Sequence, residues 1–384
     1  MMGKRVFILG TPSFPRGSAG ANYAQYLALA LMECDYKVII IGTGKNKEED
    51  QNGDSYIYKG IEYRNESNGR IQKYGLSLSF YKQMYKKFGM SNKDFYILHD
   101  IGFLAQKWLA KRVGTSQMCY IHYEDLLPIQ YRHHLVNPRY WGMLLKWNFK
   151  LNYVEKAFPI SERLKQIEKT HGCKDALLLP IMSDPDEFGE SVKLEKPEKL
   201  RFIYSGAKQN SHEDDLILLF KALQKLSTEE KKSFELHITG TSSEKLKARL
   251  NGQADTKGLN LVLHGWMEYM ELIELYRSVD FLLLPRFDNA VTQANFPSKI
   301  PEVMSFGIIP VCSDVGDYTS RYLSQNDCIT FKCGSVEDCL GSIKKAIHMD
   351  SEKYISMRKA ARKVAVTQFG YKNWSERIAS FLMK

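Results

Sequence analysis

A polar loop that leads into a short helix carries the residue types needed to hold a charged, hydroxyl-rich ligand. The stretch 288–307 reads DNAVTQANFPSKIPEVMSFG and places Lys299 and Glu302 in the first turn of the expected helix. Free N–H groups and an ammonium group suit a diphosphate, and a carboxylate can grip a ribose diol through paired hydrogen bonds. Together these groups describe a pocket for a nucleotide sugar.

A second loop, TPSFPRGSAG at 11–20, joins an expected first strand to an expected first helix. Its glycines, Gly17 and Gly20 among them, could let backbone N–H groups approach an anion. The loop has neither the GxGxxG nor the Walker spacing, so an ordinary strand-to-helix turn is an equally good interpretation.

Several titratable residues stand at expected strand ends in the first half of the chain. His122 ends a strand, and taken alone it is best interpreted as a satisfied core histidine. His99 and Asp100 end the neighbouring strand, and Glu124 and Asp125 follow His122. Any of these four could bind an acceptor hydroxyl, while capping and surface roles explain them equally well.

Strands and helices that alternate along the chain must position these residues. Apolar runs at 4–9 and 36–41 flank a helical stretch at 22–33, and a second alternating series begins at Leu200. Such alternation predicts parallel sheets with right-handed crossovers. The expected fold is therefore α/β, with two Rossmann-like, doubly wound parallel-sheet domains facing an interdomain cleft.

The boundaries follow from where each series begins and ends. We expect an N-terminal Rossmann-like acceptor-binding domain at 1–185, a polar linker at 186–199 and a C-terminal Rossmann-like nucleotide-sugar-binding domain at 200–366. A final amphipathic helix at 367–384 is expected to dock back toward the N-terminal domain.

Composition excludes several classes of protein. With 384 residues, 44% of them hydrophobic, the chain can bury a sizeable core. The first apolar run is too short for a secretory signal, and no stretch is long enough to span a bilayer. The seven cysteines are odd in number and form no CxxC pair, which argues against disulfide and zinc frameworks and favours a reducing cytoplasm.

Basic residues concentrate in the first half of the chain. The net charge is +10, and residues 1–185 hold 26 Lys and Arg against 17 Asp and Glu, while the remainder holds 28 against 27. This positive field favours an anionic partner. Charge alone does not distinguish a membrane surface, a nucleic acid and an acidic glycan.

Two segments mix aromatic and basic residues. In 79–89 the residues Phe80, Met84 and Phe88 recur every four positions beside lysines, as in a helix at a membrane interface. Packing of this stripe against the protein's own sheet is the slightly favoured alternative. The segment 131–156 could stack on single-stranded nucleic acid, but no RNP, KH or helix-turn-helix pattern accompanies it, so we expect no nucleic-acid partner.

The order and spacing of these stretches resemble the GT-B glycosyltransferases of the large retaining family 4, the glycosyl transferases group 1. The similarity extends over nearly the whole chain. It is carried by GSAGANYAQYLALAL, YKVIII, CYIHYEDLLP, FPISERLKQI, LLLPIMSDPDEF, RFIYSGAKQ, FELHITG, LVLHGWMEYMELIELYRSVDFLLLP and FPSKIPEVMSFGIIPVCSDVGD.

The resemblance implies a role for each matching residue. Glu302 corresponds to the second glutamate of the E-x7-E element, which binds ribose, and His122 to a cleft histidine that contacts the donor sugar, here assigned as the catalytic residue. His99, Asp100, Glu124 and Asp125 remain candidates for the acceptor. The implied donor site comprises Gly17, Gly20, Gly206, Lys208, Trp266, Met267, Asn295, Pro297, Ser298, Lys299 and Glu302.

Two positions depart from the family pattern. Ala294 stands where the first glutamate belongs, so its contact must come from Asp288 or Asn295 or be absent. Ala207 and His212 replace the arginine and lysine that clamp the phosphates, and Lys208 or Lys299 could supply the missing charge, although Lys208 is as well explained as a surface lysine.

The implied activity is transfer of a sugar from a UDP- or GDP-linked donor to a lipid-linked or oligosaccharide acceptor, in polysaccharide or glycolipid biosynthesis, with retention and without a metal or other cofactor. A cytoplasmic protein is expected, with peripheral binding at the inner face of the cell membrane left open. One alternative is a non-catalytic homologue that binds nucleotide or glycan as a partner subunit. Another, ranked lower, is a nucleotide-sugar 2-epimerase.

Overall fold

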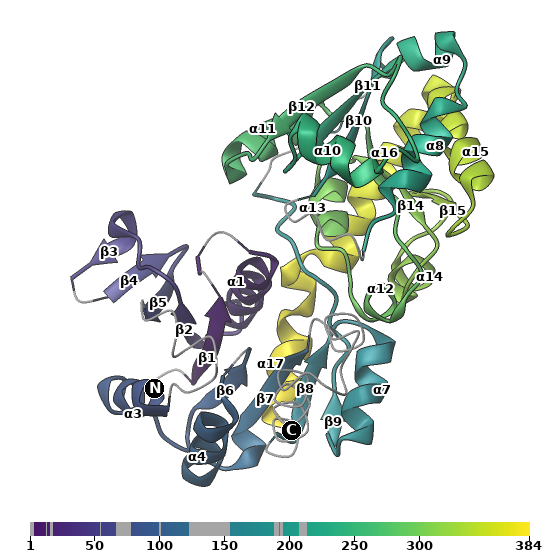
Figure 1. The fold of residues 1–384 in the computed structure, drawn as a ribbon. Coiled ribbons are helices and arrows are strands. Elements are labelled where there is room, and N and C mark those ends of the chain that lie inside the picture. Colours follow the sequence, from purple (N-terminus) through teal and green to yellow (C-terminus); the bar gives the residue numbers. More distant parts are fainter. Residues whose placement is uncertain are drawn as a thin grey trace. The chain divides into compact units, whose positions relative to one another are not determined.

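The computed structural model divides the chain into two compact units, residues 1–182 with 371–384 and residues 183–370. Each unit is built on its own β-sheet (Figure 1). The structure describes residues 4–12, 14–15, 18–53, 55–66, 78–99, 101–122, 154–187, 192, 195–206 and 213–384.

The first unit contains a nine-stranded sheet in the order β3-β4-β5-β2-β1-β6-β7-β8-β9. Neighbouring strands from β5 to β9 pair in parallel, as expected, whereas β4 pairs antiparallel with both β3 and β5. This antiparallel edge departs from the parallel sheet that the alternation of strands and helices predicts. The strands are β1 (Arg5–Pro12), β2 (Lys37–Thr43), β3 (Gln51–Asn52), β4 (Ser55–Tyr58), β5 (Ile61–Glu66), β6 (Phe95–Leu98), β7 (Met118–His122), β8 (Lys156–Pro159) and β9 (Asp175–Ala176).

Both faces of this sheet are covered. In β1 the run Val6 to Leu9 is buried on every residue, which is typical of a strand packed between two helix layers. The helices of at least one full α-helical turn described in this unit are α1 (Ala19–Met32), α3 (Leu78–Lys87), α4 (Phe103–Val113), α7 (Glu162–Thr170) and α17 (Ser375–Met383).

The C-terminal helix α17 packs within the first unit, against α1 and the strand β8 (Figure 1). The Phe381 ring lies 5.3 Å from that of Phe158 on β8, and Lys156 Nζ donates to Leu382 O at 2.8 Å. A strand and a helix more than 200 residues apart in the sequence thereby share one core.

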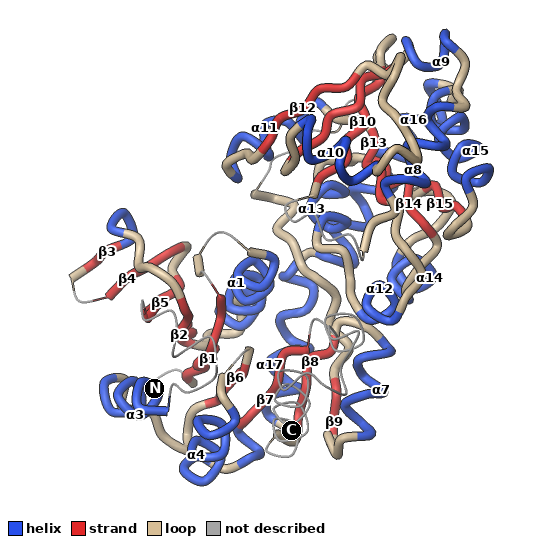
Figure 2. The backbone as a smooth tube through the Cα atoms, in the orientation of Figure 1, coloured by secondary structure: helices blue, strands red, loops and turns tan. Residues whose placement is uncertain are grey.

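The second unit contains a six-stranded, fully parallel sheet in the order β12-β11-β10-β13-β14-β15 (Figure 2). The order reverses direction between β10 and β13, as in a doubly wound fold, so ligands are expected beyond the carboxyl ends of those two strands. The strands are β10 (Leu200–Ser205), β11 (Phe234–Thr239), β12 (Leu261–Gly265), β13 (Phe281–Leu284), β14 (Ile309–Ser313) and β15 (Ile329–Phe331).

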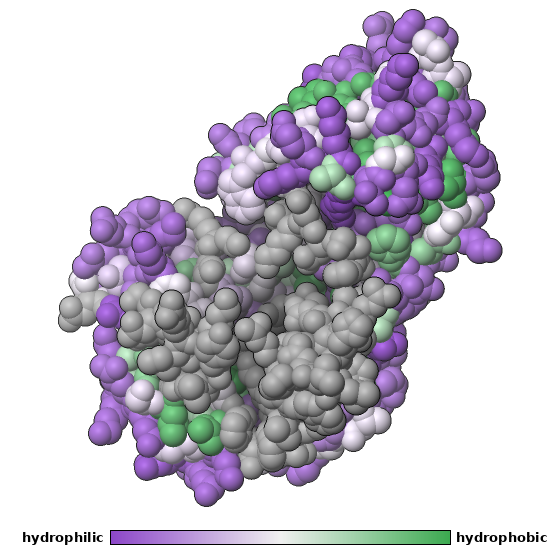
Figure 3. All heavy atoms as spheres, in the orientation of Figure 1, coloured by the Kyte–Doolittle hydropathy of each residue, from purple (hydrophilic) through white to green (hydrophobic). Residues whose placement is uncertain are grey.

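The helices of the second unit confirm the expected alternation and add several short elements. They are α8 (Leu216–Gln224), α9 (Thr228–Lys232), α10 (Ser243–Leu250), α11 (Tyr269–Ser278), α12 (Ala290–Ala294), α13 (Lys299–Ser305), α14 (Asp317–Tyr322), α15 (Val336–Ile347) and α16 (Ser351–Val364). The visible surface of this unit is mostly hydrophilic (Figure 3). The fold is thus α/β with two Rossmann-like, parallel-sheet units.

Candidate functional site

The point where the second sheet reverses direction is closed by pairing between two loops. The loop after β10 meets the loop after β13 through an antiparallel bridge between Asp214 and Arg286. Phe287 N also donates to Glu213 O at 2.9 Å. Because the bridge lies beyond the carboxyl ends of β10 and β13, it brings charged side chains to the edge where such folds bind ligands.

Arg286 is a buried cation at this edge that the sequence analysis did not single out. Its side chain is 3% exposed, and its Nη2 donates to Glu213 Oε2 at 3.2 Å and to Asn295 Oδ1 at 2.9 Å. Its Nε has no hydrogen-bond partner among the described residues. A guanidinium with a spare donor at a ligand-binding edge is suited to an anion.

Lys299 is the first residue of α13 and adds a second cation. Its Nζ lies 6.0 Å from the ring centroid of Tyr204, whose hydroxyl donates to Asp214 Oδ2 at 2.8 Å. Burial lowers the pKa of Lys299 and the nearby Arg286 lowers it further, while the carboxylates of Asp214 and Glu213 act in the opposite direction. The positive charges of Arg286 and Lys299 are therefore balanced by two carboxylates. An anionic ligand can take the place of a carboxylate beside these cations.

Glu302 lies one turn along α13 from Lys299, as the spacing predicts. Burial raises the pKa of its carboxyl to about 7. A hydrogen bond with Tyr269 at the start of α11 and the ammonium of Lys299 lower this pKa, and the carboxylate of Glu187 raises it. Near neutral pH the group is therefore balanced between acid and carboxylate, and hydroxyl donors would favour the carboxylate.

The last helix of the second unit holds α13 in place. Arg358 on α16 is fully buried and donates through Nη2 to Phe306 O at 3.2 Å, and Arg362 donates to Ser305 O. Arg358 also pairs with Asp280, whose Oδ1 lies 3.4 Å from Nη1. Cations at the C-terminal end of a helix satisfy its unpaired carbonyls, so α16 fixes the position from which Lys299 and Glu302 project.

The loop before α13 differs from the expected phosphate loop in its details. Ala294, where the family glutamate is missing, is fully buried at the end of α12. Asn295 accepts a hydrogen bond from Arg286, and Pro297 is buried and has no N–H to donate. Ser298, whose side chain makes no cap hydrogen bond, and Lys299 stand at the N-terminal end of α13, where backbone N–H groups can bind an anion.

Two exposed apolar side chains stand near the start of α11. Trp266, directly after β12, is 70% exposed, and Met270 in the first turn of α11 is 66% exposed. Met267 is half-buried between them. Tyr269, which contacts Glu302, lies in the same first turn of α11 as Met270, and Trp266 lies in the loop just before that helix.

Gly206 follows β10, and the side chain of Tyr204 leaves little room for a Cβ atom at this position. A Cβ at this position would lie 3.1 Å from Tyr204 Oη, closer than a comfortable contact. The glycine therefore lets the chain turn close over Tyr204 at the end of the strand.

In the first unit, the structure brings together two residues that the sequence analysis had named separately. The first sheet reverses direction between β1 and β6, and His99 follows β6 at that point. A Cβ on Gly20, in the first turn of α1, would lie 3.0 Å from His99 Cε1 and 3.1 Å from Pro12 Cγ. Gly20 is thus a close-approach glycine against His99, which is itself 1% exposed.

His122 is the last residue of β7, as predicted, and it is 1% exposed. Its Nδ1 lies 3.0 Å from Oε1 of Glu168, a fully buried residue on α7 that the sequence analysis did not consider. The bond spans 46 residues, so no local spacing could have indicated it.

The remaining candidates lie outside the described residues. These are Gly17, Asp100, Glu124, Asp125 and Lys208, together with the substituted positions Ala207 and His212 and residues 131–153 of the second aromatic and basic segment.

The amphipathic stripe of 79–89 packs on the protein's own core. Met84 on α3 is 4% exposed, and the Phe88 ring lies 6.2 Å from that of Phe7 on β1. Phe80 is half-buried against the same hydrophobic core, which includes Phe7 and Met84. The structure therefore supports packing over the membrane-interface interpretation of these apolar residues, while Lys82, Lys86 and Lys87 stay exposed.

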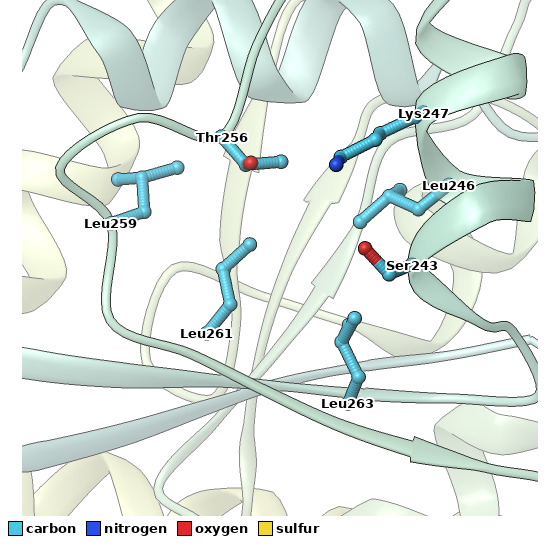
Figure 4. Close-up of a pocket in the computed structure, with 7 residues that line it drawn as sticks. All are labelled: Ser243, Leu246, Lys247, Thr256, Leu259, Leu261 and Leu263. Atoms are coloured by element: carbon cyan, nitrogen blue, oxygen red, sulfur yellow. The ribbon is translucent and has the colours of Figure 1, made fainter.

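A separate cavity of about 250 Å³ lies between α10 and β12 (Figure 4). Leu261 and Leu263 line it from the strand, and Ser243 and Lys247 point into it from the helix. None of its lining residues belongs to the Lys299 and Glu302 cluster. In the part of the chain that the structure describes, no group of three His, Cys, Asp or Glu residues could hold a metal ion.

None of the described helices is both long and apolar enough to cross a bilayer.

Comparison with known proteins agrees with the fold. Residues 187–364 match the family described as Glycosyl transferases group 1. Sucrose-phosphate synthase from Thermosynechococcus elongatus is 12% identical, with a TM-score of 0.72 over 99% of this chain and 98% of that one. No curated protein sequence matches the chain.

Two further solved structures are similar. Anabaena HepE, in complex with UDP and glucose, is 12% identical with a TM-score of 0.68 and 99% of each chain covered. WaaG, a glycosyltransferase involved in lipopolysaccharide biosynthesis, is 13% identical with a TM-score of 0.67, covering 98% of this chain and 99% of that chain. These likenesses show the GT-B fold.

Proposed function

We propose that the chain is a glycosyltransferase of the glycosyl transferases group 1 family, because residues 187–364 match that family and the fold is GT-B, and we propose its substrates. The donor is a UDP- or GDP-linked sugar. The acceptor is a lipid-linked or oligosaccharide glycan, and the product belongs to polysaccharide or glycolipid assembly. The observation that carries the donor proposal is the cluster of Arg286, Lys299 and Glu302 beyond the carboxyl ends of β10 and β13.

Arg286 and Lys299 are the cations that we assign to the donor diphosphate. Glu213 and Asn295 both accept hydrogen bonds from Nη2 of Arg286 and so orient its guanidinium group. The Nε–H group has no hydrogen-bond partner among the described residues. Lys299 lies over Tyr204 in the same cluster. In this role they replace the family arginine and lysine whose positions are taken by Ala207 and His212, and they stabilise the leaving diphosphate without a metal.

Glu302 is assigned to the ribose diol. A carboxylate that accepts two hydroxyl hydrogen bonds gains most when it is desolvated, as this one is. Trp266 and Met267 follow β12, and an exposed indole offers a flat surface for the base. The structure of HepE with UDP and glucose is a reason to favour a uridine-linked donor for this chain. The binding test below distinguishes a UDP-linked from a GDP-linked sugar.

The first unit is proposed to contribute His122 as a contact to the donor sugar, in the role that the family resemblance implies. His99 with Gly20, and the acidic residues Asp100, Glu124 and Asp125, remain the proposed acceptor group. Transfer with retention then proceeds by front-face displacement, in which the leaving phosphate takes the proton of the acceptor hydroxyl. This step needs no protein nucleophile, and none is assigned.

The donor assignment is tested by thermal shift with a panel of UDP, GDP, ADP and CDP, each with and without Mg²⁺. A ligand that binds only the folded protein raises the melting temperature, and at about 100 times its Kd it adds roughly 2.7 kcal/mol of stability. We expect one nucleotide to stand out and the shift to vanish in Lys299→Met. Lys247→Met, in the separate cavity, is the matched control and should keep the shift. Equal shifts in both variants would remove the cluster from the donor site.

Transfer itself is tested with the radiolabelled sugar of the selected nucleotide and membrane-lipid or oligosaccharide acceptors. Label should enter the acceptor only when one is supplied. Release of free sugar without any acceptor would instead indicate an epimerase or hydrolase.

Peripheral binding at the inner face of the cell membrane is proposed for the lysines of α3. Lys82, Lys86 and Lys87 are exposed, in a half of the chain with excess positive charge. Each exposed cation near an anionic bilayer contributes about 1 kcal/mol. We expect the triple change to glutamine to weaken binding to phosphatidylglycerol vesicles at low salt, and unchanged sedimentation with those vesicles would reject this surface.

A further inference from the structure

The side chains of His122 and Glu168 are almost completely buried and face each other. His122 ends β7 and is 1% exposed, and Glu168 lies in the last turn of α7 and is 0% exposed. Their Nδ1 and Oε1 atoms lie 3.0 Å apart, a hydrogen-bond distance that requires one proton between them.

Four states place one proton between these two atoms around neutral pH. In the first, Glu168 is a neutral acid that donates to Nδ1, so the neutral imidazole carries its proton on Nε2. In the second, the carboxylate faces a fully protonated imidazolium, which again has a proton on Nε2. In the third, the carboxylate accepts from Nδ1–H of a neutral imidazole, and Nε2 is a bare acceptor. In the fourth, Glu168 is a neutral acid protonated on Oε2 whose Oε1 accepts from Nδ1–H, and Nε2 is again bare. The fourth state buries an O–H donor without an acceptor, because Glu168 Oε2 has no hydrogen-bond partner among the described residues.

Only the third state leaves a net charge of −1 buried in the core, and such a charge is costly unless a cation compensates it. The site favours loss of that charge. Burial raises the pKa of Glu168 to about 9. A carboxylate in the C-terminal turn of a helix is also disfavoured by the helix dipole.

The described groups around the pair do not reverse this balance. Cys119 on β7 and Cys173 after α7 are thiols whose pKa values are raised, that of Cys173 to about 12, so they stay neutral. Lys156 on β8 is a cation that acts on Cys119, and its Nζ donates hydrogen bonds to the carbonyl oxygens of Ser116 and Leu382. Each net-neutral state that leaves no buried O–H donor without an acceptor therefore has a proton on Nε2.

We propose that Glu168 is a positioning residue that keeps His122 protonated on Nε2, so that His122 acts as a hydrogen-bond donor and never as a general base. This inference rests on the proposed role of His122 at the donor sugar. The atom that His122 recognises must then be an acceptor, such as a sugar hydroxyl oxygen or a phosphate oxygen. It also agrees with a transfer step in which the leaving phosphate takes the acceptor proton.

The protonation state can be read without any activity. In full-length protein labelled with ¹⁵N in the histidine rings, the signals of His122 are identified as those lost in His122→Gln. We expect a protonated, directly coupled Nε2 throughout pH 6 to 8 in the wild-type protein. An unprotonated Nε2 at pH 7 would overturn the inference.

Variants of Glu168 add a kinetic test, whose expected result differs from that for a residue with only a structural role. Glu168→Gln can still donate to Nδ1 and should keep the Nε2–H signal, with a smaller loss of kcat than Glu168→Leu. At saturating donor, kcat of the wild type should show no inflection near the ordinary histidine pKa of about 6.5, whereas Glu168→Leu should gain one. Urea unfolding shows whether the leucine variant is folded, and if it is not, the glutamine variant and the wild-type spectrum decide.

The two proposals fail in different ways. If Nε2 is protonated but His122→Gln keeps the wild-type kcat/KM, His122 has no role at the donor sugar and the positioning role of Glu168 falls with it. If His122→Gln is inactive but Nε2 carries no proton, the contact of His122 with the donor sugar stands. The assignment of His122 as a hydrogen-bond donor is then wrong.

Discussion

Donor affinity is expected to depend on pH through Glu302. In the free protein the pKa of this carboxyl is raised to about 7, chiefly by burial, and only the carboxylate can accept two hydrogen bonds from a ribose diol. A pKa near 7 means about 90% carboxylate at pH 8 and about 10% at pH 6. The Kd of the donor should therefore rise about tenfold between pH 8 and pH 6, or roughly 1.4 kcal/mol.

The assay is isothermal titration calorimetry with the intact nucleotide sugar, whose diphosphate does not titrate between pH 6 and 8. At pH 6 binding should also release protons to the buffer, because the ligand stabilises the carboxylate. In Glu302→Gln the affinity should be lower at pH 8 by about 1.5 to 3 kcal/mol, as for a lost charged hydrogen bond, and independent of pH.

Two outcomes would refute the reasoning. A tenfold slope that persists in Glu302→Gln would assign the titration to another group. A flat profile in the wild type would mean that Glu302 is already ionised, or that it does not contact the ligand.

The same raised pKa has a consequence for stability. A carboxyl group with a folded-state pKa above its unfolded value contributes stability below the unfolded pKa of about 4.5, and this contribution is lost as the pH rises through about 7. Glu302→Gln should therefore remove part of the decrease in unfolding free energy between pH 5 and 7.5, measured by urea titration. Ligand binding should offset the same decrease in the wild type.

Three further predictions follow from single contacts. Gly20→Ala should lower the unfolding free energy by about 1 to 3 kcal/mol in urea titrations, because the new Cβ meets His99 at 3.0 Å; no loss would mean that the contact relaxes freely. Trp266→Ala should weaken nucleotide binding by about 1 to 3 kcal/mol and abolish any quenching of tryptophan fluorescence by the nucleotide. Arg358→Met should destabilise the protein by about 3 kcal/mol because it leaves Asp280 buried without its cation, and a neutral effect in chemical unfolding would contradict that role.

Much of the fold follows from local patterns in the sequence. The apolar runs of β1, β2 and β10 and the amphipathic repeats of α4 and α15 lie where periodicity places them. Ser161, a residue type favoured at helix N-caps, caps α7 by accepting a hydrogen bond from Leu164 N. What periodicity missed were elements too short or too polar to show a clear period, such as β3, β4 and α12.

The sequence by itself determined which chemistry this protein can offer at α13, because Lys299 and Glu302 are three residues apart and share a helix face whatever surrounds them. Only the tertiary structure decided their partners. Arg286 meets Glu213 across 73 residues, and His122 meets Glu168 across 46. Such contacts depend on strand order and on how deeply each group is buried, and burial then sets which groups hold their protons.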